Sequence, residues 1–172
     1  MKRLVMASLV AVFALGPVLA FGAGGGGGGG DDARTPPGKP EDPDYTAAVK
    51  AIKAKNYAAA IPLLEAVVTR DDTNADAYNW LAYATRKNGD PGKSVPIYEK
   101  ALAIDPKHRG AHEYIGEAYL ALNNLPKAKE HLARLDKLCF FPCSEYTDLK
   151  KAVQAYEKNG RSMPAGSVPA SR

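Results

Sequence analysis

Cysteine and histidine are scarce in this chain of 172 residues, which has two of the first and three of the second. None of the histidines lies in a recognisable catalytic motif. An enzyme needs a nucleophile with a base, paired carboxylates in a pocket or an open metal site. We therefore expect a protein that is not an enzyme and that needs no cofactor.

A strong excess of one charge is also lacking. The formal net charge is +4 at pH 7, and it falls by two if the first twenty residues are removed. A value so close to neutral gives no argument for nucleic acid or for an anionic membrane surface as a partner. We therefore expect no nucleic-acid partner.

The N-terminus has the pattern of an export signal. Lys2 and Arg3 precede an uncharged apolar run over residues 4–15, and small residues follow a Gly-Pro break. This pattern predicts a secretory signal peptide over residues 1–20 and a periplasmic or secreted protein. The uncharged stretch continues to Gly30, so an uncleaved membrane anchor is the alternative, and membrane contact is expected only in that case.

Two segments lack the large apolar residues that a core requires. Residues 24–30 are seven consecutive glycines, and residues 31–40 contain no apolar residue larger than alanine or proline. Such a segment cannot bury enough surface to offset the entropy cost of ordering, so residues 21–43 are expected to be a disordered linker. Residues 159–172 are likewise expected to be a flexible tail.

From about residue 41 onward the sequence repeats itself at a spacing of 34. Residues 60–65 read AIPLLE and residues 94–99 read SVPIYE, and the two align residue for residue at that offset. Even the proline within the segment recurs. A fixed period of this length is typical of stacked helical repeats.

The block over residues 75–108 has the fullest pattern, in which large, small and aromatic residues lie where two antiparallel helices pack closely. These residues are Tyr78, Leu81, Ala82, Gly89, Asp90, Ser94, Tyr98, Ala101, Leu102, Asp105 and Pro106. The pattern resembles the tetratricopeptide-repeat (TPR) family, with Thr85 as the clear departure. With its leader, the chain is similar to exported bacterial members of that family.

The resemblance implies an all-α fold, a right-handed superhelical stack of about three helix-turn-helix repeats. The repeats are expected over residues 41–142, as blocks 41–74, 75–108 and 109–142. Local start and stop signals agree. The six helices are expected at residues 44–54, 57–70, 75–87, 91–104, 109–122 and 125–138. A seventh, amphipathic helix within residues 143–158 should cap the apolar face of the last repeat.

The resemblance also implies that the first helix of each repeat lines a concave groove for a partner. The groove positions are Tyr45, Val49, Ile52, Asn79, Tyr83, Arg86, Glu113, Glu117 and Leu120. The groove would change from apolar through cationic to acidic, which would suit a protein or peptide partner of unknown identity. Alternatively these are partly solvated helix faces, with the apolar trio covered by the linker or by a second copy, which would make a homo-oligomer.

Cys139 and Cys143 enclose Phe140, Phe141 and a proline. In an exported chain with two cysteines, a local structural disulfide is the expected state, and the two phenylalanines should pack in the seam that the turn covers. An exposed aromatic docking knob is the alternative for Phe140 and Phe141. The alternative for the cysteines is a thiol-redox or metal-handling protein that uses the repeats as a scaffold.

No metal site is expected from the histidines. His108 and His112 are four residues apart, which would suit two ligands on one helix. The break at Pro106 should separate them, and His112 lies at a core position of the third block. We therefore expect a histidine in a turn and a histidine in the core.

Overall fold

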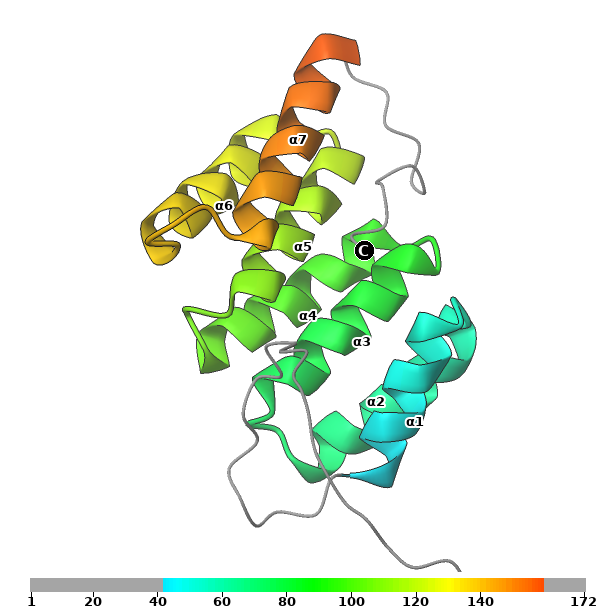
Figure 1. Cartoon of the computed structure of the whole chain (residues 1–172). Coiled ribbons are helices and arrows are strands. Elements are labelled where there is room, and N and C mark those ends of the chain that lie inside the picture. The colour runs from blue at the N-terminus through cyan, green and yellow to red at the C-terminus, as the bar shows by residue number, and fades with distance from the viewer. Residues whose placement is uncertain (1–41, 160–172) are drawn as a thin grey trace, which may run out of the picture. The chain divides into compact units, whose positions relative to one another are not determined.

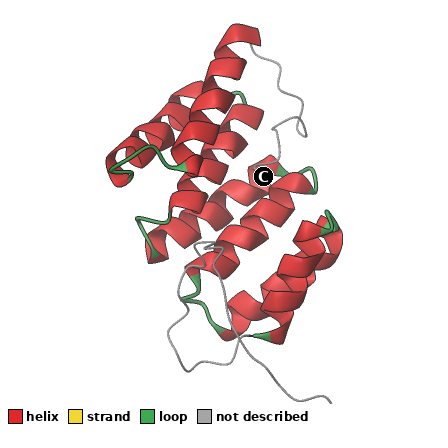
Figure 2. Cartoon of the chain, viewed as in Figure 1, coloured by secondary structure: helices red, strands yellow, loops and turns green. Residues whose placement is uncertain are grey.

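The computed structural model describes residues 42–159, and these residues form helices joined by short turns, without a strand (Figure 1, Figure 2). The helices are α1 (Pro43–Lys53), α2 (Tyr57–Arg70), α3 (Ala75–Lys87), α4 (Pro91–Ile104), α5 (Arg109–Ala121), α6 (Leu125–Leu138) and α7 (Ser144–Asn159). The predicted all-α fold is therefore confirmed. No helix in this part of the chain has the length and apolar character that crossing a membrane requires.

Side-chain caps explain where the helices begin. A side chain of the residue before each of α1 to α6 accepts a hydrogen bond from a backbone N–H of the first turn. The capping residues are Asp42, Asn56, Asn74, Asp90, His108 and Asn124. Such caps satisfy amide groups that the helix itself leaves without a partner.

Proline occupies the first or second position of α1, α4 and α6, where its missing N–H costs nothing. The first of these prolines is Pro43, and its helix is capped by Asp42. The expected linker over residues 21–43 therefore ends at least two residues early. The predicted signal peptide, the rest of the linker and the tail beyond residue 159 lie outside the described residues.

Each helix packs against the next, and α7 packs against both α5 and α6 (Figure 1). Alanines with no exposed surface lie at the contacts between helices, and examples are Ala60, Ala82, Ala101 and Ala118. Small side chains at these positions let helices approach closely, while larger residues such as Leu64 and Tyr98 fill the space between them. The spacing of 34 thus places equivalent core residues at each step of the stack.

The helix α7 covers the end of this stack. Its residues Leu149, Ala152, Val153 and Tyr156 are buried, and they share a core cluster with Leu120, Ala128 and Leu135. The side chain of Leu149 lies directly over Gly116 of α5, where an added Cβ would come within 2.7 Å of both Leu149 methyl carbons. The predicted helix is therefore present and shields the apolar face of α5 and α6.

Candidate partner-binding site

The predicted groove residues lie on the first helix of each repeat, three on α1, three on α3 and three on α5. They are more enclosed than the lining of an open groove. Tyr45, Val49 and Tyr83 are half-buried. The other six are buried: Ile52, Asn79, Arg86, Glu113, Glu117 and Leu120. Helix α3 contacts α5 as well as α1. The contact with α5 brings the α3 and α5 residues together.

A buried ion pair joins α3 to α5. Arg86 Nη2 lies 2.6 Å from Glu117 Oε2, in a geometry that meets the distance of an ion pair but not the angles of a hydrogen bond. Burial raises the pKa of Glu117, and the nearby guanidinium of Arg86 opposes that rise. The positive charge predicted for the middle of the groove is therefore already paired within the protein.

Glu113 lies one turn before Glu117 on α5, and no cation among residues 42–159 forms an ion pair with it. Its Oε1 is buried and accepts no hydrogen bond from these residues. Burial, together with the carboxylates of Glu117, Asp148 and Glu145, raises the pKa of Glu113 to about 9, although Arg86 opposes the rise. Glu113 is consequently protonated at neutral pH, so the acidic end of the predicted groove has less negative charge than its sequence indicates.

A cluster of aromatic side chains surrounds Tyr83. The ring of Tyr83 lies 6.1 Å from that of Tyr57, 5.6 Å from that of Trp80 and 4.9 Å from that of Tyr114, between ring centroids. All four side chains are half-buried. They come from α2, α3 and α5, so the stacking of the repeats assembles the cluster.

Cations border this aromatic cluster. The guanidinium carbon of Arg86 lies 5.5 Å from the centroid of the Tyr83 ring and 5.8 Å from that of Tyr114. The ammonium of Lys87 lies 5.8 Å from the Tyr83 ring, within the range of a cation–π contact. Sequence reasoning found Tyr83 but missed Tyr57, Trp80 and Tyr114 as parts of the site. The spacing of Trp80 and Tyr83, three residues apart on one helix, was the one local signal.

A pocket of about 330 Å³ lies on another part of the surface, lined by Leu102, Pro106, His112, Glu130, His131 and Arg134. His112 is buried, as its core position predicted, and its Nε2 lies 3.0 Å from the carbonyl oxygen of Pro106. With a neutral ring this Nε2 donates the hydrogen bond, so Nδ1 accepts one from His131 Nδ1 at 3.0 Å. Burial lowers the pKa of both rings, that of His131 to about 4.

His108 lies in a turn, as expected, and has a structural role. Its Nδ1 accepts a hydrogen bond from the backbone N–H of Ala111 at 3.1 Å, and its Nε2 lies 3.0 Å from Asp76 Oδ1. The described residues contain no group of three or more metal-ligating side chains. The histidines of this region thus cap a helix and join two helices.

The cysteines form the expected disulfide between Cys139 and Cys143, with their Cα atoms 5.8 Å apart. The expectation for the intervening phenylalanines was wrong. Phe140 and Phe141 are 94% and 76% exposed. The physical reason is that Tyr146 and Leu149 of α7 already cover the seam, and the loop closed by the disulfide is too short to fold back over it.

Comparisons with known proteins agree with this architecture. Two family models described as tetratricopeptide repeat match residues 45–108 and 85–138. A curated relative, Tetratricopeptide repeat protein 1 of Schizosaccharomyces pombe, is 33% identical over 92 residues, which are 50% of this chain. The matched segment spans only 9% of that relative.

Three solved structures share the fold. SycD, a type III secretion translocator chaperone of Yersinia enterocolitica, has a TM-score of 0.62 at 16% identity and covers 69% of this chain and 84% of its own. PcrH, solved with the chaperone-binding region of PopD, has 0.61 at 15% identity and covers 67% and 90%. The first TPR of Spaghetti (RPAP3), solved with an HSP90 peptide, has 0.60 at 22% identity and covers 66% and 90%.

The two family models together span residues 45–138, which is more than half of the chain. This is also the region in which the helices pair and stack at a spacing of 34 residues. The chain therefore belongs to the tetratricopeptide-repeat family.

Proposed function

We propose that this chain is an exported adaptor that binds a protein or peptide partner on the face formed by α1, α3 and α5. The observation that carries the proposal is the half-buried aromatic cluster around Tyr83. Tyrosine, tryptophan and arginine are the residues most enriched among those that dominate binding energy at protein interfaces. Here Trp80, Tyr83 and Arg86 lie on α3 and Tyr114 lies on α5, which are first helices of their repeats, and Tyr57 of α2 completes the cluster.

Peptide complexes of similar structures support the same class of partner. PcrH was solved with a segment of PopD, and the first TPR of Spaghetti with an HSP90 peptide. At 15% and 22% identity these structures show a shared fold, so they do not identify the partner of this chain. Among the described residues, the Tyr83 cluster offers rings and an arginine that is already neutralised by Glu117. We infer that an apolar or aromatic side chain of the partner contacts the rings.

The test is partner binding by a Tyr83→Ala variant. Loss of the central ring should weaken binding by at least about 2 kcal/mol without loss of helicity. Tyr78→Ala is a matched control, because Tyr78 is also a half-buried tyrosine of α3 but lies near Lys100 of α4. Partners captured by the wild-type chain from its own extract would first be identified and then titrated against both variants. Equal binding by wild type and Tyr83→Ala would contradict the proposed site.

Export is proposed from the N-terminal pattern over residues 1–20, and a disulfide in the described domain is compatible with an oxidising compartment. The exported protein should begin at Phe21, after cleavage behind the small residues. Intact mass of the exported protein measures this directly. A chain that keeps Met1 and remains in the membrane fraction would instead show an uncleaved anchor.

A thiol-redox or metal-handling role for Cys139 and Cys143 is the second candidate. The observation in its favour is that the pair lies on a short loop with exposed neighbours, where a reductant could reach it. Counting free thiols after purification from an oxidising compartment separates the two functions. A stable disulfide supports the adaptor, and a pair that cycles readily between thiol and disulfide supports the redox role.

A further inference from the structure

The most exposed apolar surface of the described residues is the tip of the loop between α6 and α7. Among residues 42–159, three large hydrophobic side chains are exposed: Leu122 at 42%, Phe140 at 94% and Phe141 at 76%. Isolated apolar residues are common on protein surfaces, but an adjacent pair of phenylalanines with this exposure is not accounted for by the packing of the repeats.

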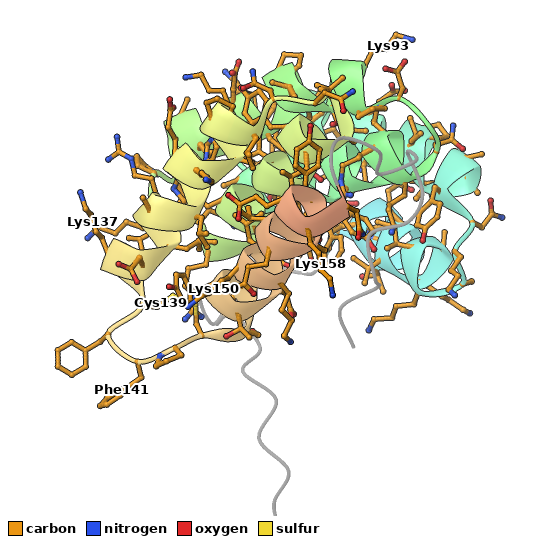
Figure 3. The ribbon with its side chains drawn as sticks, turned by 90° about the horizontal axis from the view of Figure 1, so that it is seen from above. Lys93, Lys137, Cys139, Phe141, Lys150 and Lys158 are labelled. Carbon is orange, nitrogen blue, oxygen red and sulfur yellow. A yellow bond between two sulfur atoms is a disulfide. The ribbon has the colours of Figure 1, made fainter. Side chains whose placement is uncertain are left out.

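The loop holds the two rings away from the helices. The loop lies between the end of α6 at Leu138 and the start of α7 at Ser144. Its first and last residues, Cys139 and Cys143, are joined by the disulfide. Figure 3 shows Phe141 at the outer end of this loop, beyond the ribbon of both helices. The rings contact one another edge to face, with centroids 5.0 Å apart. Because the disulfide already restrains the loop, the loop would lose little conformational entropy when its tip binds another surface.

Two lysines accompany the rings. Lys137 lies in the last turn of α6 and Lys150 in the second turn of α7, and Figure 3 shows both at the end of the molecule that carries the loop. Neither makes an ion pair with another described residue. The ammonium of Lys150 lies 5.4 Å from the centroid of the Tyr146 ring, so Lys150 lies beside the first turn of α7, which follows the loop. The tip therefore combines apolar rings with cations that no described carboxylate pairs.

Most of the neighbouring carboxylates are already paired. Glu145 lies 3.5 Å from Arg109, and Asp148 lies 3.2 Å from Lys151. Asp136 is exposed next to Lys137 and opposes part of its charge. The rings should consequently supply most of the binding energy, and the lysines should add a smaller electrostatic contribution.

We propose that Phe140 and Phe141 insert into the surface of an anionic lipid membrane, with Lys137 and Lys150 at the level of the headgroups. Apolar rings that enter the acyl boundary, flanked by lysines that reach the headgroups, are the features of interfacial membrane binding. The tip is convex. A lipid surface accepts a convex apolar tip without a matching pocket, whereas a protein partner would have to supply one.

This surface is distinct from the proposed partner site. The Tyr83 cluster lies on α2, α3 and α5, and the tip lies between α6 and α7. Two rings and two lysines should give weak, reversible attachment. The membrane would then position the adaptor while the Tyr83 face remains available, and either function could fail without the other.

The test is co-sedimentation of the disulfide-bonded chain beginning at Phe21 with vesicles. This chain lacks the apolar run over residues 4–15, which could bind lipid by itself. Vesicles of mixed phosphatidylglycerol and phosphatidylcholine are compared with vesicles of phosphatidylcholine alone. The wild-type chain should bind the anionic vesicles, and the double variant Phe140→Ser/Phe141→Ser should bind at least about tenfold more weakly. Leu122→Ser, at the other exposed apolar position, should bind like wild type.

A second set of variants tests the charges. Replacing Lys137 or Lys150 by glutamine should weaken binding to anionic vesicles by up to about fivefold for each lysine, with no such change on phosphatidylcholine alone. Lys93→Gln is the control, because Lys93 is exposed at the other side of the molecule (Figure 3). Its binding should be unchanged.

Three results would overturn the proposal. The wild-type chain could stay in solution with both kinds of vesicle, or Leu122→Ser could lose as much binding as the double phenylalanine variant. Sedimentation without lipid could also show that the wild-type chain is a dimer and that the double variant is a monomer. In that case a second copy of the chain occupies the tip. Thermal unfolding of each variant excludes misfolding as the cause, since substitution of such exposed side chains should leave the melting temperature unchanged.

Discussion

Arg86 and Glu117 form a charged contact between α3 and α5, with side chains that are only 5% and 6% exposed. The pair therefore connects the second and third repeats through the interior. Burial of two charges is costly, and their mutual attraction offsets that cost only while both are present. This relationship, together with the protonated Glu113 beside it, makes the α3–α5 contact sensitive to charge.

Removal of the cation should be strongly destabilising. Arg86→Met would leave Glu117 buried without its guanidinium, and we expect the free energy of unfolding to fall by about 3–5 kcal/mol. Arg134→Met, at an exposed arginine of α6, should change it by no more than about 0.5 kcal/mol. Urea unfolding followed by circular dichroism measures both variants. A similar small effect of both changes would show that the Arg86 pair is solvated in solution.

The raised pKa of Glu113 predicts stability that falls with pH. The carboxyl group has an ordinary pKa of 4.5 in the unfolded chain and about 9 in the folded one. Its contribution is thus complete below pH 4.5 and is lost as pH rises toward 9, because folding then requires uptake of a proton. Glu113→Gln cannot ionise. Its stability relative to wild type should therefore increase between pH 6 and pH 8, by up to about 1.4 kcal/mol per pH unit.

Urea unfolding at pH 6, 7 and 8 measures the difference between wild type and Glu113→Gln. The exposed Glu65 of α2 supplies the control, and Glu65→Gln should run parallel to wild type at all three values. If the Glu113→Gln curve also runs parallel, Glu113 is ionised in the folded protein at neutral pH and its assignment as a protonated group is wrong.

Gly116 should tolerate no side chain beneath α7. A Cβ at this position would lie 2.6 Å from the Cδ2 atom of Leu149, and Leu149 is fully buried. Gly116→Ala should lower the free energy of unfolding by about 1–3 kcal/mol, because overpacking outweighs the better helix propensity of alanine. Gly92→Ala in α4, where an added Cβ would lie 3.7 Å from Asp90 Oδ1, should not be destabilising.

The rate of proteolysis provides a second test of the Gly116→Ala variant. If α7 is displaced by the new methyl group, cleavage within Ser144–Asn159 should be faster in Gly116→Ala than in Gly92→Ala. Equal cleavage and equal stability would mean that the end of the stack repacks without cost.

The disulfide should make a modest contribution to global stability. A loop closed over so few residues is worth about 2 kcal/mol in the chain-entropy model. Cys139→Ser/Cys143→Ser should lower the free energy of unfolding by about that amount, and dithiothreitol should lower wild type equally while leaving the double variant unchanged. A much larger loss would mean that the bridge, and not the apolar contacts of α7, holds the last helix in place.

The helices could be predicted because their signals are local. Asn74 before α3, Asp90 before α4 and Pro91 in its first turn specify where the chain enters a helix. The recurrence at 34 residues then predicts how successive helices pair. Four of the helices, α2, α3, α4 and α6, have the predicted bounds. Helix α1 is shifted by one residue at both ends, and α5 ends one residue early.

The site could be predicted only in part, because exposure depends on what packs over a helix. The spacing of Arg86, Glu113 and Glu117 places them on the helix faces that are predicted to line the groove. From the sequence alone, all three side chains are expected to be charged. In the structure α3, α5 and α7 bring these groups together, so the charges are paired or protonated.

The phenylalanine tip shows the same division. From sequence alone, Phe140 and Phe141 are apolar residues between two cysteines, and the hydrophobic effect predicts their burial. The position of α7 decides otherwise, since its own Leu149 and Tyr146 fill the seam first. The helices, their caps and their repeat depend on neighbours along the chain, so they follow from the order of the residues. Burial depends on neighbours that are distant in sequence, so which side chains are covered became clear only from the packing of the helices.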